Sequence, residues 1–217
     1  MMLIYVIILI FLKGSELVHD FLACRVLYMK LNNNDVVKDN NKILREKSLD
    51  VKLPLNKENK ELLQSMYEGV KLSTSQDIED IDKLKPASGL AAIQVGHKKR
   101  MLVVICDEYD KNDNLIHYEY ALVNPKVISR SIQLAALKNG EGCLSVEDFH
   151  EGYVYRNARI RVKAYDLLQD KEINIRARGY LAIVLQHELD HLDGVLYYDH
   201  IKKEDLYYTI EGAEIIG

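Results

Sequence analysis

The sequence predicts an α+β fold, because segments of helix character and segments of strand character are segregated along the chain. Apolar residues spaced three, four and seven apart predict a helix over 56–72, and a mostly apolar run predicts a second, buried helix from Gly179. Strand-like runs lie between the two helices, at about 100–107, 115–123, 158–165 and 173–177. A doubly wound sheet would instead show a helix after each strand.

Local signals support each element in chain order. Residues 43–55 predict an extended segment held against the core. Asn56 is a suitable N-cap for the first helix. The apolar stripe that follows predicts core packing rather than a cofactor site, and it comprises Leu62, Leu63, Met66, Tyr67 and Val70. The polar runs 110–114 and 169–171 each predict a turn between two strands.

Length, charge and cysteine content limit the class of protein. The chain has 217 residues and a net charge of −4, with acidic and basic residues interspersed. This length predicts one domain, and no basic run indicates direct, sequence-specific nucleic-acid binding, although weak RNA contact through a local patch stays open. Three cysteines are too few for a disulfide framework and predict a reducing, cytoplasmic location. Cys106 lies in an apolar run and is expected in the core, whereas the glycine-flanked Cys143 suits a reactive or ligating thiolate.

The N-terminal residues 1–28 are expected to be an extension that precedes the catalytic domain, 29–217. Residues 1–12 are apolar. That run is shorter than the roughly 20 residues of a membrane-spanning helix, and no Lys or Arg precedes it as in a signal peptide. A weak membrane anchor is the alternative, and Met29 is a plausible start of the domain.

The most informative stretch is the HELDH sequence of residues 187–191. Since a helix turns once in 3.6 residues, His187 and His191 face the same side and can share a divalent metal ion. Glu188 lies one step around the helix, close enough to exchange a proton with a water molecule on the metal. A chance match on a surface helix is the alternative, but the apolar run before the motif favours a buried helix.

A catalytic metal usually has three protein ligands, so two imidazoles leave the set one short. The candidates are Cys143 upstream and Asp199 or His200 downstream. Neither downstream residue follows the glycine-containing spacer of a metzincin, so Cys143 has the better context. One Cys and two His suit Zn(II), Fe(II), Co(II) or Ni(II), and ligand chemistry alone does not choose among them.

Hydrolysis of a carbonyl compound at such a metal needs a proton carrier and donors for the developing oxyanion. Glu188 would take the proton of the attacking water and pass it to a leaving amine. Gln94, on a loop rich in glycine and alanine, is a candidate donor, as is the backbone N–H of Leu144. A buried Glu141 would be costly if left alone, so we expect Arg156 to neutralise it.

Three segments resemble the signature motifs of bacterial peptide deformylases, in the same order and at about the same spacing: Gly89–Gln94, Glu141–Ser145 and Gln186–His191. The second and third motifs match fully. The first departs at Ala87, where the family usually has glycine, and at Ile93, where it often has proline or threonine. Residues 146–156 and the short C-terminal tail resemble the second, Gram-positive-type class of the family.

The resemblance implies a role for individual residues and an arrangement for the fold. It implies a metal-ligand set of Cys143, His187 and His191. It implies a catalytic set of Glu188, Gln94, the backbone N–H of Leu144, and Gly89. A pocket for the methionine side chain would contain Ser88, Tyr180 and Ile183, for which ordinary core packing is the alternative. The family fold has mixed and antiparallel sheets packed around a central helix that bears the HExxH motif.

The activity that the resemblance implies is hydrolysis of the N-formyl group from formyl-methionine at the start of new polypeptides, with release of formate. The metal is then expected to be Fe(II), and the partners are nascent chains and, transiently, the ribosome near its exit tunnel. We expect a monomer. One alternative is a zinc endopeptidase, which would share HExxH but lack the other two motifs. The other is a catalytically impaired, ribosome-associated relative, for which Ala87 and Ile93 are the only grounds.

Overall fold

The computed structural model describes residues 31–75, 84–110 and 112–217, and it confirms the α+β class. The predicted extension, 1–28, lies outside the described residues. Within these ranges, no helix is both long enough and apolar enough to cross a membrane.

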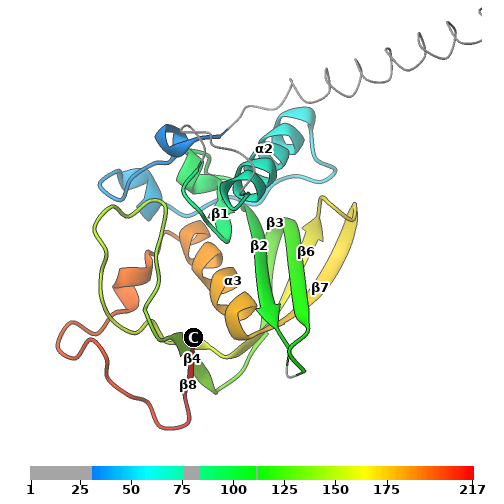
Figure 1. The fold of residues 1–217 in the computed structure, drawn as a ribbon. Coiled ribbons are helices and arrows are strands. Elements are labelled where there is room, and N and C mark those ends of the chain that lie inside the picture. The colour runs from blue at the N-terminus through cyan, green and yellow to red at the C-terminus, as the bar shows by residue number, and fades with distance from the viewer. Residues whose placement is uncertain (1–30, 76–83, 111) are drawn as a thin grey trace, which may run out of the picture.

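Two sheets form the β part of the fold (Figure 1). The larger sheet is antiparallel, with the order β1-β2-β3-β6-β7, and its strands are Gly89–Ala91, Met101–Tyr109, Leu115–Arg130, Arg159–Asp166 and Lys171–Arg178. The smaller sheet has the order β5-β4-β8, and its strands are Arg156–Asn157, Leu134–Leu137 and Glu214–Ile216. In the smaller sheet β4 pairs antiparallel with β5 and parallel with β8.

Two α-helices lie on opposite faces of the larger sheet. The first, α2 (Lys57–Ser73), begins after Asn56, whose side chain accepts a hydrogen bond from the N–H of Asn59 at 2.9 Å, as the sequence predicts. The second, α3 (Gly179–Leu192), also contacts β4 and β5 of the smaller sheet. Four short 3₁₀ helices complete the described elements: η1 (Asn33–Asp35), η2 (Lys42–Arg45), η3 (Ala92–Val95) and η4 (Tyr197–His200).

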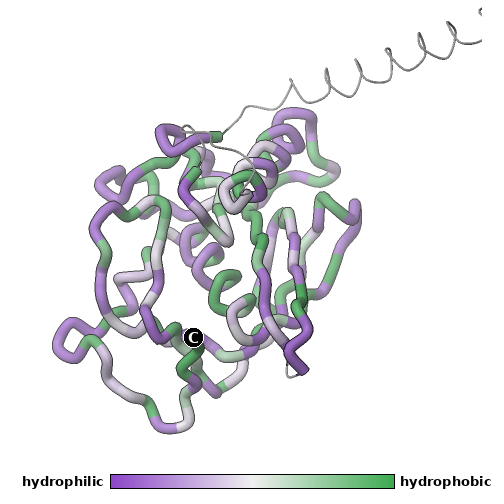
Figure 2. The backbone as a smooth tube through the Cα atoms, viewed as in Figure 1, coloured by the Kyte–Doolittle hydropathy of each residue, from purple (hydrophilic) through white to green (hydrophobic). Residues whose placement is uncertain are grey.

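The strand β2 is apolar at successive positions because both of its faces are covered. Leu102 and Val104 join the core cluster that surrounds α3, whereas Met101 and Val103 join the cluster beneath α2. The strand β6 alternates instead, with buried residues facing α3 and charged residues facing solvent, and Figure 2 shows this alternation of hydropathy along the sheet.

Three predictions about the elements need correction. The strand predicted to end at residue 123 continues to Arg130, because register shifts carry it past Pro125. Residues 42–45 form a 3₁₀ helix rather than an extended segment. The strands β4, β5 and β8 were not predicted, since each is four residues or shorter and its pairing depends on distant segments.

Candidate active site

The helix α3 carries three polar residues into the protein interior. His187, Glu188 and His191 are all buried. The helix can begin where it does because Gly179 has a positive φ of 55°, and a Cβ atom there would overlap the carboxylate of Glu108. That carboxylate accepts a hydrogen bond from the N–H of Tyr180 at 3.1 Å, which holds the first turn in place.

Three potential metal ligands converge at this helix. The Sγ atom of Cys143 lies 3.2 Å from Nε2 of His191, which lies 3.2 Å from Nε2 of His187. The three donor atoms all lie within 4.8 Å of one another. One thiolate and two imidazoles at this spacing fit a tetrahedral site for a borderline divalent ion with one position left for water. The structure therefore brings together the three ligands that the sequence predicts.

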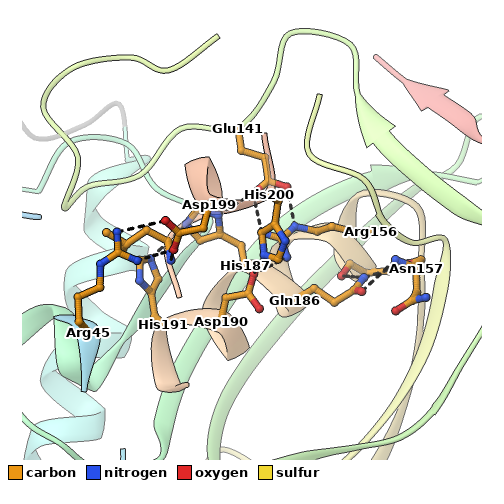
Figure 3. A network of polar contacts seen from close by, with 12 residues as sticks. Arg45, Glu141, Arg156, Asn157, Gln186, His187, Asp190, His191, Asp199 and His200 are labelled. Atoms are coloured by element: carbon orange, nitrogen blue, oxygen red, sulfur yellow. Dashed lines mark hydrogen bonds and ion pairs between the residues drawn. The ribbon is translucent and has the colours of Figure 1, made fainter. Parts of the chain in front are cut away.

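The orientation of His187 is determined by a buried ion-pair network (Figure 3). The Nδ1 atom of His187 lies 2.7 Å from Oε2 of Glu141. Arg156 binds the same carboxylate through two hydrogen bonds, of 2.6 and 2.9 Å, which confirms the predicted pairing of Glu141 and Arg156. A carboxylate that accepts the Nδ1 proton directs the Nε2 lone pair of the ring toward the metal position.

The charges around the two imidazoles differ. Burial would raise the pKa of Glu141, but Arg156 and the hydrogen bond from His187 outweigh burial and hold this pKa at about 2. Burial also disfavours the charged form of His187, but Cys143 and Glu141 outweigh it and raise the pKa of this ring to about 10. Burial and the charge of His187 lower the pKa of His191 well below its usual value. The group of donors thus has a high affinity for one positive charge, which a proton or a metal cation can supply.

Glu188 faces the same cavity as the ligand atoms. Its Oε2 is buried and has no hydrogen-bond partner among the described residues. Burial raises the pKa of this carboxyl to about 7, against the opposing effects of His187 and Arg156. Gly89 allows the close approach, because a Cβ atom there would lie 2.5 Å from Oε1 of Glu188. Gly89 and the side chain of Glu188 are therefore in close contact in the fold, although the two residues are far apart in the sequence.

Gln94 is oriented by hydrogen bonds at both ends of its amide. Its Oε1 accepts from the N–H of Ala91 at 2.8 Å, and its Nε2 donates to Oγ of Ser145 at 3.2 Å and lies 3.5 Å from Sγ of Cys143. The N–H₂ group thus points toward the ligand cluster. Leu144 lies beside the same cavity, and its carbonyl accepts a hydrogen bond from Nζ of Lys38 at 3.0 Å.

A pocket of about 420 Å³ opens onto Glu188 and the ligands Cys143 and His187. The three residues predicted to bind a methionine side chain all line it: Ser88, Tyr180 and Ile183. A hydrogen bond of 2.9 Å joins the hydroxyl groups of Ser88 and Tyr180. The pocket is lined by both apolar and polar side chains, as small-molecule and peptide side-chain sites usually are.

The two departures from the family motif are accommodated. Ala87 is not among the described residues with a positive φ, so its methyl group causes no backbone strain. Ile93 is fully buried in the core cluster around α3 and does not line the pocket. Ala87 lines the pocket, whereas Ile93 lies outside it.

The sequence did not predict the outer part of the network. Asp190 binds Nη1 of Arg156 at 2.8 Å and Nε2 of His200 at 2.7 Å (Figure 3). The ring of Tyr197 lies parallel to that of His187, with centroids 6.0 Å apart. Asp190 lies two residues after Glu188 in the HELDH sequence, and this position was the one signal in the sequence for the outer network. The contacts of His200 and Tyr197 depend on the fold.

The fold and the site define an α+β protein with a Cys-His-His cluster, largely buried, that is suited to a metal ion. A family model for polypeptide deformylase matches residues 33–206. The chain is 45% identical over 179 residues to peptide deformylase 2 of Bacillus subtilis, covering 82% of this chain and 95% of that protein. It is 43% identical over 175 residues to a peptide deformylase of Macrococcus caseolyticus, covering 81% and 93%. The chain therefore belongs to the polypeptide deformylase family, and its relatives include the Gram-positive enzymes of the predicted class.

Solved structures agree with this assignment. Peptide deformylase from Ehrlichia chaffeensis in complex with actinonin is 32% identical, with a TM-score of 0.65, and covers 82% of this chain and 92% of that one. The Met-Ala-Ser-bound class I type b peptide deformylase from Acinetobacter baumannii is 25% identical, with a TM-score of 0.63, and covers 81% and 100%. The chain is an amide hydrolase of protein N-terminal processing.

Proposed function

We propose that this enzyme removes the N-formyl group from polypeptides that begin with formyl-methionine and releases formate. The observation that carries the proposal is the convergence of Cys143, His187 and His191 beside the unpartnered carboxylate of Glu188 at the floor of a pocket. We propose that these three residues hold one divalent metal ion, Fe(II) in the cell. Such an ion supplies Lewis acidity and lowers the pKa of water.

The residues around the cluster then have separate roles. Glu188 accepts a proton from the attacking water and delivers it to the leaving amine, since its buried Oε2 has no hydrogen-bond partner among the described residues and its side chain lines the pocket beside the ligands. The Nε2 group of Gln94 and the N–H of Leu144 donate hydrogen bonds to the oxygen of the formyl carbonyl as negative charge develops on it. Gly89 leaves room for Glu188.

The substrate follows from the pocket and from the relatives. We propose that Ser88, Tyr180 and Ile183 surround the methionine side chain, and the Met-Ala-Ser peptide bound by the Acinetobacter baumannii enzyme supports this choice. The position of α3 between the two sheets supports a central role for the HExxH helix. Nascent chains are made in the cytoplasm, so we place the enzyme there, as a monomer that contacts the ribosome transiently.

A formate-release assay tests the proposal. Protein purified without oxygen and loaded with Fe(II) or Ni(II) is given formyl-Met-Ala-Ser and, separately, an internally quenched peptide without a formyl group. We expect formate from the first peptide and no cleavage of the second; cleavage of the second would indicate an endopeptidase. We also expect the iron form to lose activity in air faster than the nickel form, and equal half-lives would contradict the choice of iron.

Two variants separate metal binding from proton transfer. Cys143→Ser should lose most of its metal, because an alcohol is a poor ligand for these ions. Glu188→Gln should keep its metal and lose nearly all turnover, because an amide cannot accept the proton of water. Full metal occupancy in the first variant, or substantial turnover in the second, would contradict the assigned roles.

We also propose that residues 29–217 are sufficient for catalysis. A chain that starts at Met29 should retain activity and solubility, because all three motifs lie downstream of it. Aggregation of that shorter chain, or a loss of its activity, would contradict the proposed boundary.

A further inference from the structure

The strands β6 and β7 present a strongly basic face to solvent. Their inward residues are buried in the core cluster around α3, and these include Ile160, Val162, Ile175 and Ala177. Five of their exposed, outward residues are basic, beside Glu172 and Asn174: Arg159, Arg161, Lys163, Arg176 and Arg178. We refer to these five residues as the arginine face. It lies at the end of the larger sheet away from β1 (Figure 1).

The register of the two strands places like charges directly opposite each other. Arg159 pairs with Arg178, and Arg161 pairs with Arg176. Neighbouring strands are about 4.8 Å apart, and like charges in directly opposite positions destabilise a sheet. A one-residue slip of either strand would turn that strand's charges toward the core, so the hydrophobic pattern disfavours the slip and maintains the repulsion.

The described residues do little to neutralise this charge. Neither Arg161 nor Arg176 has an ion pair among them, and Arg159 donates a hydrogen bond to the neutral side chain of Gln133 at 3.0 Å. Lys163 pairs with Glu172 at 3.1 Å at one end of the face. At the other end, Arg178 is close enough to Asp110 to lower the pKa of that carboxyl, after the larger effects of Asn114 and Asn112. The centre of the face therefore remains positive in a chain whose net charge is −4.

We propose that the arginine face binds the phosphate backbone of RNA without reading its base sequence. Guanidinium groups present a planar fork of donors that matches phosphate oxygens in pairs. Alternate residues of one strand are about 6.7 Å apart, so β6 and β7 offer two parallel rows of such donors. An anionic ligand would convert the unfavourable Arg–Arg pairs into favourable contacts.

The composition of the face favours RNA over an anionic membrane. Between Arg159 and Lys163, and across from them on β7, no apolar side chain is exposed that would insert into a bilayer. No aromatic ring stands among these positions for stacking on unpaired bases. An array of cations without rings or wedges among them suits the regular phosphates of a structured RNA. This inference stands on the charge pattern and not on the proposed catalytic chemistry.

Binding of a fluorescein-labelled RNA hairpin, followed by anisotropy over a series of salt concentrations, tests the proposal. The test variant of the full chain is Arg161→Gln/Arg176→Gln. The control is Lys60→Gln/Lys203→Gln, which changes the net charge equally at exposed lysines elsewhere. We expect the test variant to bind at least about tenfold more weakly at low salt, with the salt slope reduced by about one for each residue removed. The control should bind as the unmodified chain does.

Three results would overturn the proposal: no binding of the hairpin by the unmodified chain at low salt, equal weakening in test and control variants, or tighter binding to phosphatidylserine vesicles than to RNA. Thermal melting shows whether the test variant is folded, and loss of the Arg–Arg repulsion should leave its Tm equal or higher. Formate release from a short formyl peptide should be the same in both variants, because neither pair contacts the pocket. Failure of catalysis and failure of RNA binding are therefore distinguishable.

Discussion

Replacing Arg156 by methionine should be among the most destabilising single changes in this protein. The side chains of Glu141 and Arg156 are only 3% and 4% exposed, and two hydrogen bonds join them. Methionine fills a similar length but removes the guanidinium from the buried carboxylate of Glu141, which then keeps only its contact with His187. Removing one partner of a buried ion pair typically costs about 3–5 kcal/mol, because the remaining charge is uncompensated.

The assay is thermal unfolding at a common metal loading, with Arg45→Met as the matched control. Each kcal/mol shifts the Tm of a domain of this size by about 2–4 °C, so Arg156→Met should lower the Tm by about 6–20 °C. Arg45 forms its ion pair with Asp199 at the surface, where the two side chains are 41% and 35% exposed. Loss of such a pair costs less than about 1 kcal/mol.

A double variant shows whether the uncompensated charge is the cause. Glu141→Gln/Arg156→Met should recover part of the lost stability, because neither partner then carries a buried charge. His187 would lose its carboxylate partner in this variant, so metal affinity should fall by about 10–100-fold even where stability recovers. If Arg156→Met and Arg45→Met shift the Tm equally, the reasoning about burial is wrong.

Three further predictions concern other parts of the site and the sheet. Gly89→Ala should lower kcat strongly and leave the metal content unchanged, because the new Cβ would displace the side chain of Glu188. Gly142→Ala is the control and should have little effect, because there is open space around Gly142. Similar losses of kcat in the two variants would contradict this prediction. Gln94→Leu should reduce kcat by about 10²–10³-fold, the usual loss for one oxyanion donor, and a reduction of less than about tenfold would argue for a structural role instead. Burial alone would raise the pKa of Glu119, but hydrogen bonds from His117, Tyr67 and Lys71 lower it to about 2. This carboxylate therefore stabilises the fold at a pH above its unfolded pKa of about 4.5, and its contribution is lost as the pH falls toward 2. The difference in unfolding free energy between the unmodified chain and Glu119→Gln should therefore shrink over that pH range, and a difference independent of pH would refute the assignment.

Much of the site was predictable because its residues lie in short motifs whose local geometry is simple. The spacing of His187 and His191 places both rings on one helical face in any α-helix, and the structure places them so. Asn56 and the stripe after it predicted α2 to within a residue at each end. The pairing of Glu141 with Arg156 was predicted because a charge that is buried without a partner is costly.

Other features depend on contacts between distant segments, which local patterns do not encode. The parallel pairing of β4 with β8 joins residues near 135 to residues near 215, and neither strand is long enough to show periodicity. Gly89 and Glu188 meet only because β1 packs on α3. His200 reaches the network through Asp190 because η4 folds back beside the helix.

The arginine face illustrates the same division between local pattern and tertiary contact. Along the chain, basic residues alternate with apolar ones in two separate strands, and this alternation correctly predicts which side of each strand is buried. The local pattern therefore determines the secondary structure, the ligand spacing and the buried faces, because these depend on periods of a few residues. The predicted turn at 169–171 also makes β6 and β7 neighbours, and the buried pattern of both strands limits their register. Tertiary packing decided the rest, because α3 and the core cover one face of this strand pair and leave the opposite face, with Arg161 across from Arg176, as a basic surface in a chain whose net charge is negative.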